Sequence, residues 1–226
     1  MSIIRDTPKM RGFIAVGVLA VCAVSGFRAA GQAASSKDLT VTKVDGKQVK
    51  VPATGPLANP TAQEVAAGVL DYDKQVKSHP PGRHASPEVA RAMQQMADES
   101  RNEAVEQLDL TYRVAQETSG PLDSELLDGA KKNVEFVREI MRAPPPPNLN
   151  VHTAISASVP NAILHYCLRA DYLRKACDWH SYNSGALMPI GRYMFRVESS
   201  EGSPNIQEEI VLVLNDPTQL VILPMH

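Results

Sequence analysis

The chain has 226 residues, a formal net charge of −2, three cysteines and a single tryptophan. This length leaves room for one or two small domains beside a targeting segment. Basic residues are not in excess and form no concentrated patch, so we expect no nucleic-acid partner.

The first 33 residues are typical of a secretory signal peptide. Arg5, Lys9 and Arg11 precede the uncharged apolar run "GFIAVGVLAVCAVSGF", and small residues follow it. A basic start, an apolar middle and a small-residue exit define such a signal. The run has sixteen residues, fewer than the roughly 20 that span a bilayer. We therefore expect cleavage after Ala33 and a periplasmic or secreted protein.

Three further observations concern this segment. Met1 and Met10 are both candidate starts. A lipoprotein signal needs a small residue before its cysteine, and Val21 stands before Cys22, which argues against lipid anchoring. Removing residues 1–33 takes away four of the 23 basic and one of the 25 acidic residues, which leaves a net charge of −5.

Residues 34–60 are expected to form a β-hairpin followed by a loop. Two runs rich in valine flank Asp45-Gly46 in "LTVTKVDGKQVKVP". Asp-Gly in this position is a strong hairpin signal, because a type I′ turn needs a positive φ at both central residues. A lone hairpin is marginally stable in water, so we expect this one to pack on another element.

Residues 61–142 are predicted to form three amphipathic helices, packed as a helical hairpin or three-helix unit. Thr61 and Glu64 suggest a capping box at the first helix, and Ser86 with Pro87 marks the start of the second. Each helix has one apolar and one charged face, which favours a core shared by the helices. The alternative is a homo-oligomer formed through this helical unit.

A run of prolines, "APPPPNLN" at residues 143–150, separates the helices from a β-rich region. Four consecutive prolines fix φ, remove four N–H donors and favour a stiff polyproline II spacer. We therefore expect few contacts across this run and an independent domain over residues 151–226.

Short apolar runs bounded by turn residues predict that this domain is a small antiparallel β-sandwich. "GRYMFRVE" places Tyr193, Phe195 and Val197 on one face, and "QEEIVLVLN" and "QLVILP" are two further strands. Residues 162–177 fit the helix and strand periods equally well, and the neighbouring strands favour strand. The whole chain is thus predicted to be an α+β protein.

Residues 151–224 resemble the PEGA-type, Ig-like extracytoplasmic β-domain of bacteria. The resemblance rests on "SASVPNAILHYCL", "LMPIGRYMFRVESSEG" and "EEIVLVLNDPTQLVIL". Asn161 stands where that family usually has glycine, and Ile190 is inserted before Gly191. The resemblance implies an accessory module of the surface or envelope rather than a catalyst, and it supplies no active-site residue.

Cys167 and Cys177 are the candidates for a disulfide. An exported protein with two cysteines left after cleavage, separated by a short loop, most simply pairs them. In one continuous helix their Cα atoms would lie about 15 Å apart, whereas a disulfide needs less than about 7 Å. The bond therefore requires the chain to turn back. The alternatives are free core cysteines and a zinc site made by His165, Cys167, Cys177 and His180.

Trp179, Tyr172 and Tyr182 are the candidate binding residues beside this pair. A tryptophan next to a disulfide is expected to pack on it as a core aromatic, as in Ig-like domains. The alternative is an exposed aromatic platform for a sugar or a protein partner.

The sequence contains no recognisable catalytic motif or phosphate-binding loop, so we expect no enzyme, no catalytic residue and no cofactor. We expect an exported, non-catalytic binding or scaffolding protein of the cell envelope, which contacts a protein or a cell-wall polysaccharide. Two alternatives remain open. One is a zinc-binding protein that uses the four residues named above, and the other is a helical oligomerisation subunit of an envelope assembly.

Overall fold

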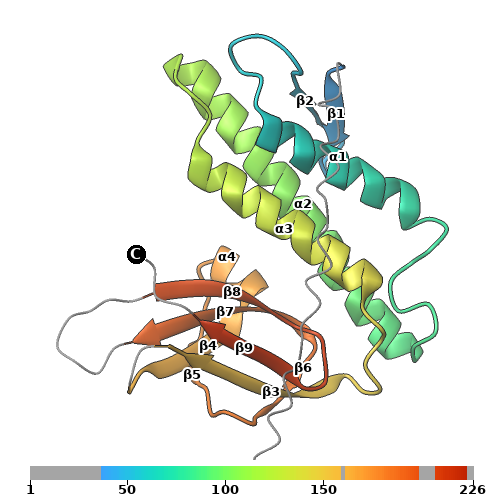
Figure 1. Ribbon diagram of the computed structural model, residues 1–226, viewed down its shortest axis with the longest axis vertical. Coiled ribbons are helices and arrows are strands. Elements are labelled where there is room, and N and C mark those ends of the chain that lie inside the picture. Colours follow the sequence, from blue (N-terminus) through green and yellow to red (C-terminus); the bar gives the residue numbers. More distant parts are fainter. Residues whose placement is uncertain (1–36, 159–160, 199–206, 223–226) are drawn as a thin grey trace, which may run out of the picture. The chain divides into compact units, whose positions relative to one another are not determined.

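The structure, a computed structural model, describes residues 37–158, 161–198 and 207–222 (Figure 1). The predictions of a signal peptide and of its cleavage, including the Cys22 alternative, lie outside these residues. No helix in the described ranges is long and apolar enough to cross a membrane.

The predicted N-terminal hairpin is confirmed, but its turn differs. β1 (Leu39–Thr42) and β2 (Gln48–Val51) pair in antiparallel orientation. Gly46 has a positive φ of 84° and Asp45 does not, so the turn is not the predicted type I′. The Asp45 carboxylate instead accepts a hydrogen bond from the N–H of Lys47 (3.0 Å), which closes the loop locally.

Three helices follow: α1 (Pro60–Gln75), α2 (Pro87–Thr118) and α3 (Ser124–Arg142). Each begins after a residue whose side chain accepts hydrogen bonds from N–H groups of the first turn: Asn59, Ser86 and Asp123. Ser86 caps α2 as predicted, whereas the capping box at Thr61 is wrong because Asn59 caps α1. Figure 1 shows α2 and α3 running side by side.

One apolar core lies between the hairpin and the helices. Val41, Val49 and Val51 are almost fully buried in a cluster with the apolar stripes of the three helices. At the hairpin's end, the Lys43 ammonium lies 2.7 Å from the Asp109 carboxylate of α2. The hairpin therefore gains its stability from the helices, as expected for two strands alone.

The C-terminal strands form two sheets that share one core. The first has the order β6 (Leu187–Pro189), β3 (Asn150–Ala157), β9 (Thr218–Ile222). The second has the order β5 (His180–Ser181), β4 (Ile163–Leu168), β7 (Gly191–Glu198), β8 (Gln207–Val213). The α+β class and the small sandwich are confirmed. One pairing departs from the antiparallel expectation, because β3 and β9 are parallel.

Residues from both sides of the proline run share the core of the sandwich. Met93 and Ile140 of the helices lie in one apolar cluster with Val151 and Phe195 of the strands, and all four are fully buried. The expectation of few contacts across residues 143–150 is therefore wrong, because apolar burial joins the helices to the sheet. The division into domains at this run stays a prediction.

Candidate functional site

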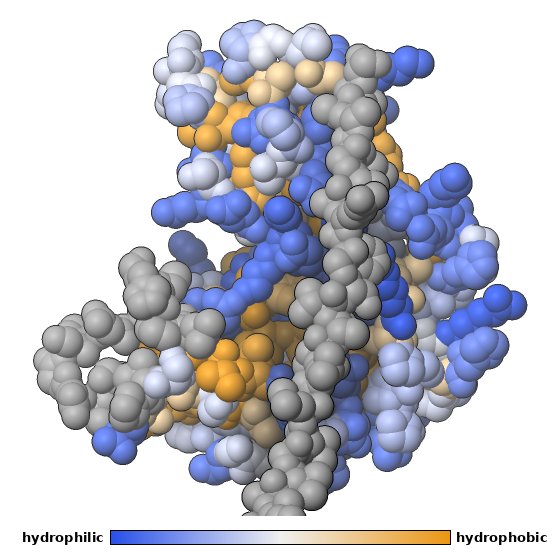
Figure 2. Space-filling view, in the orientation of Figure 1, coloured by the Kyte–Doolittle hydropathy of each residue, from blue (hydrophilic) through white to orange (hydrophobic). Residues whose placement is uncertain are grey.

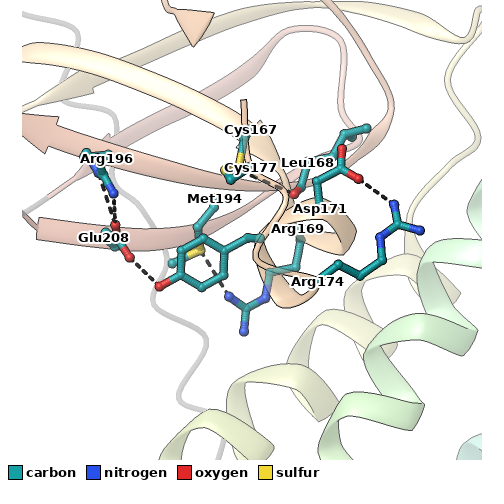
Figure 3. The surroundings of a disulfide bond; sticks show 10 residues. Cys167, Leu168, Arg169, Asp171, Arg174, Cys177, Met194, Arg196 and Glu208 are labelled. Carbon is teal, nitrogen blue, oxygen red and sulfur yellow. Dashed lines mark hydrogen bonds and ion pairs between the residues drawn. A yellow bond between two sulfur atoms is a disulfide. The ribbon is translucent and has the colours of Figure 1, made fainter. Parts of the chain in front are cut away.

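The predicted cysteine pair closes a loop at the end of β4 (Figure 3). Cys167 on β4 is bonded to Cys177, and their Cα atoms lie 5.9 Å apart. β4 ends one residue after Cys167, and the short helix α4 (Arg169–Leu173) follows at once. Lys175, with a φ of 57°, then turns the chain back. The stretch that fitted both the helix and the strand period therefore forms a strand followed by a short helix.

The zinc alternative does not fit this arrangement. The Sγ atoms of Cys167 and Cys177 are bonded to each other, and a zinc ligand must be a free thiolate. His165 faces Glu198 at 3.8 Å, and the His180 ring lies against Tyr166 with 5.5 Å between centroids. In the part of the chain that the structure describes, no three His, Cys, Asp or Glu residues are grouped to hold a metal ion.

Four partly exposed side chains next to the disulfide loop form what we call the Trp179 surface: Tyr172, Trp179, Arg196 and Glu208. The Arg196 guanidinium lies over the Trp179 ring, 4.1 Å from its centroid. Arg196 also binds the Glu208 carboxylate at 2.8 Å, a pair that Figure 3 shows on neighbouring strands. The Tyr172 ring meets Trp179 edge-on, with 6.3 Å between centroids. The rings and the charges therefore hold one another in place.

Two pKa values follow from these contacts. Partial burial alone raises the pKa of Glu208, but the Tyr172 hydroxyl and the Arg196 guanidinium outweigh it, and the pKa lies below its usual range. The hydrogen bond to this carboxylate raises the pKa of Tyr172. At neutral pH the surface thus presents a neutral phenol, an indole and a balanced ion pair. It offers ring stacking and hydrogen bonding to a partner.

Tyr182, the third predicted binding residue, lies in the core. It is 8% exposed, and its ring packs edge-on against Phe195. Its hydroxyl accepts a hydrogen bond from the N–H of Ile155 and donates one to Thr153 Oγ1, both at 3.0 Å. Tyr182 therefore ties β3 to the other sheet and is not available to a partner. Trp179, which was expected to be the core aromatic packed on the disulfide, is instead partly exposed.

Beside the disulfide loop lies a buried charged cluster that the sequence did not predict: Glu103 of α2, Asn133 of α3, Arg169 of α4 and Arg192 of β7. The Glu103 carboxylate binds Arg169 at 2.5 Å through one oxygen and Arg192 at 2.7 Å through the other. Arg192 also donates to the Asn133 side-chain oxygen (2.6 Å). All four residues are at least nine-tenths buried, so the cluster joins the helices to the strands in a low-dielectric environment.

The protonation of Glu103 depends on its two arginine partners. Burial alone raises the pKa of this carboxyl group, but the hydrogen bond from Arg169 and the charge of Arg192 more than offset it. The pKa of Glu103 therefore lies below its ordinary value, and the carboxylate is ionised at neutral pH. The Nε atom of Arg192 is buried without a hydrogen-bond partner, so this charge is less well satisfied than the others.

A weak signal for the cluster is present in α2. Its apolar stripe runs through Met96 and Ala97 and resumes at Ala104. Ser100 and Glu103, four and seven residues after Met96, are buried polar residues in this gap. A polar interruption of an apolar stripe indicates a buried partner, but it does not say which distant arginines supply the positive charge.

No protein-family model, no curated protein and no solved structure matches this chain. The resemblance to PEGA-type domains therefore stays a prediction.

We predict that Glu103→Ala lowers the free energy of unfolding by about 3–5 kcal/mol, because it leaves two buried guanidinium groups without a counter-charge. Chemical denaturation measures this change. Glu117→Ala, an exposed glutamate on the same helix, is the control and should cost less than about 0.5 kcal/mol. Equal effects of the two substitutions would contradict the role given to Glu103.

Because of the same cluster, the free energy of unfolding should decrease at acidic pH. Because the pKa of Glu103 is lowered in the folded chain, its contribution is complete above its ordinary pKa of 4.5. The contribution is lost as the pH falls through the lowered value. In Glu103→Gln the stability should therefore fall less steeply below pH 4.5 than in the unsubstituted chain. Parallel curves for the two chains would mean that this carboxylate does not titrate as described.

We predict that Cys167→Ala with Cys177→Ala lowers the free energy of unfolding by ~2–3 kcal/mol, because the loop regains entropy in the unfolded state. The unsubstituted chain in a reducing agent should match the double variant. A double variant as stable as the oxidised chain would show that the bond adds nothing.

Proposed function

We propose that this chain is an exported, non-catalytic binding or scaffolding protein of the cell envelope, and that the Trp179 surface is where it binds. The observation that carries the proposal is the position of Trp179, the single tryptophan of the chain. It is partly exposed, lies beside the guanidinium of Arg196 and is displayed next to a disulfide-closed loop. Tryptophan, tyrosine and arginine are the side chains that most often dominate binding energies.

Export is supported by two independent features. The first 33 residues have the order of charge, apolar residues and small residues that a signal peptide needs. The bond between Cys167 and Cys177 is consistent with an oxidising compartment, since cytosolic thiols are kept reduced.

The chemistry of the surface limits its partners. An indole and a phenol offer apolar ring surface, and the adjoining Arg196 and Glu208 offer hydrogen bonds in both directions. This combination suits a protein segment or the sugar rings of a cell-wall polysaccharide. A zinc-dependent role is not retained, because both candidate thiolates are used in the disulfide.

A second candidate is a helical oligomerisation subunit. Leu110 and Val114 lie one turn apart on α2 and are 38% and 37% exposed, which is the spacing of a contact stripe. Two side chains make a small surface, so this candidate ranks below binding at Trp179. A defined oligomer that Leu110→Lys converts to monomer would favour it.

We predict that soluble fragments of cell-wall polysaccharide change the emission of Trp179, which is a site-specific reporter because the chain has no other tryptophan. Arg196→Ala should weaken this binding about tenfold. Leu173→Ala, at an exposed position of α4 outside the surface, should leave it unchanged.

A protein partner would be detected in the exporting cell by a photo-crosslinker placed at position 178, an exposed residue next to Trp179, so that the tryptophan is kept. A crosslink there, lost with Arg196→Ala and kept with Leu173→Ala, would support the protein arm of the proposal. Absence of both polysaccharide binding and crosslinking would contradict the proposed function.

A further inference from the structure

A groove of about 440 Å³ runs between α3 and the strands β8 and β9. Lys132, Phe136 and Glu139 of α3 form one wall, residues 209–212 of β8 form another, and residues 218–222 of β9 form the third. Figure 2, in the same orientation as Figure 1, shows apolar surface over this part of the sandwich. Leu220 and Val221 of β9 are 37% and 55% exposed there.

The groove follows the open edges of the two sheets. Among the described strands, β8 pairs only with β7, and β9 pairs only with β3. Successive side chains of a strand point to opposite faces. A groove that contacts every residue from 218 to 222 must therefore lie along the edge of β9, where its unpaired N–H and C=O groups are. The same holds for residues 209–212 of β8.

β9 lacks the features that usually protect an edge strand. Its sequence, "TQLVI", contains no charge and no proline. Natural edge strands are commonly protected by lysine, proline or a bulge, because a bare edge is a template for another strand. The opposite edge of the same sheet, β6, has such protection, because Pro189 lies within it.

One end of the groove carries the carboxyl group of Glu139. Glu139 lies where this groove meets a second cavity, of about 550 Å³, which is lined in addition by Arg138 and Arg142. Arg138 pairs with Glu64, and Glu139 makes no ion pair within the residues that the structure describes. The wall of the groove removes water from its carboxyl group and raises the pKa of Glu139, although the residue as a whole is exposed. The other cations near the groove do not neutralise it: Lys132 pairs with Glu209, and Arg142 makes no ion pair with Glu139 within the described residues.

We infer that this groove binds an extended peptide segment of a partner protein, which adds as a strand to the edge of β9. The segment alternates apolar and polar side chains, because its apolar residues enter the groove between the sheets. It carries a lysine or arginine at the end that faces Glu139. This site is separate from the Trp179 surface and does not depend on the function proposed for that surface.

The test uses fluorescein-labelled peptides of about seven alternating valines and threonines, a length that matches one strand. Two of the peptides carry a lysine, one at its N-terminal end and one at its C-terminal end, because the added strand could run in either direction. Two matched peptides carry glutamate at the same positions. Fluorescence anisotropy with residues 34–226 should show one lysine peptide binding about tenfold more tightly than its glutamate counterpart. Glu139→Gln should remove that difference.

Leu220→Lys, which puts a charge on the open edge, should weaken the lysine peptide about tenfold. Leu187→Lys is the matched control, because Leu187 is an exposed leucine on the other edge of the same sheet; it should change binding by less than about twofold. Trp179→Ala should also leave binding unchanged, which separates this site from the proposed function.

Three results would overturn the inference. The first is no binding at about 1 mM peptide, the second is binding that Leu220→Lys leaves intact, and the third is a dimer that Leu220→Lys dissociates, which would assign the groove to a second copy. Strong protection of the β8 and β9 edge amides in the free chain would likewise show that the chain covers its own edge. If Leu220→Lys does not fold, peptide-induced NMR shifts in the unsubstituted chain decide: shifts confined to β8, β9 and α3 support the site, and shifts elsewhere refute it.

Discussion

The buried carboxylate of Glu103 is the interaction on which the arrangement of this protein depends. It binds Arg169 and Arg192, which come from α4 and β7, while Glu103 itself lies on α2. Bringing one carboxylate and two guanidinium groups out of water costs several kcal/mol per ion, and only close, hydrogen-bonded geometry offsets that cost. The geometry exists only when the helices and the second sheet are packed together. The cluster is therefore a specific connection between the two, added to the less specific apolar core around Met93 and Phe195.

The elements that form the Trp179 surface are also the ones that the Glu103 cluster holds in place. Arg169 begins α4, and the Cys167–Cys177 bond closes the loop that contains α4. Arg196, four residues after Arg192 on β7, points to the same face of the sheet and reaches Trp179. One strand thus supplies a buried charge at the helical interface and a partly exposed charge at the candidate site.

Local patterns in the sequence predicted most of the elements, because their causes are local. Asp45-Gly46 indicated a hairpin, Ser86-Pro87 began a helix, and the alternation of Tyr193, Phe195 and Val197 gave the buried face of β7. The disulfide was also predictable, since it required only a pair of cysteines, a short loop and an export signal.

The rest is not local, and the sequence could not predict it. Arg192 and Met194 lie on the face of β7 opposite Phe195, and they are only 4% and 6% exposed because helices pack against that face as well. The proline run suggested separation, but apolar side chains on both sides of it pack into one core. Tyr182 and Trp179 exchanged the expected roles for the same reason: which aromatic is buried depends on how two sheets meet, and no spacing within the chain encodes that.

We infer that the helices and the sandwich fold as one unit around Glu103. The most direct measurement is denaturant unfolding of residues 34–226, followed by far-ultraviolet circular dichroism for the helices and by Trp179 emission for the sandwich. We predict coincident transitions with one midpoint, and a common shift of both to lower denaturant in Glu103→Ala. Two separate midpoints, with only the helical one moved by the substitution, would contradict the account.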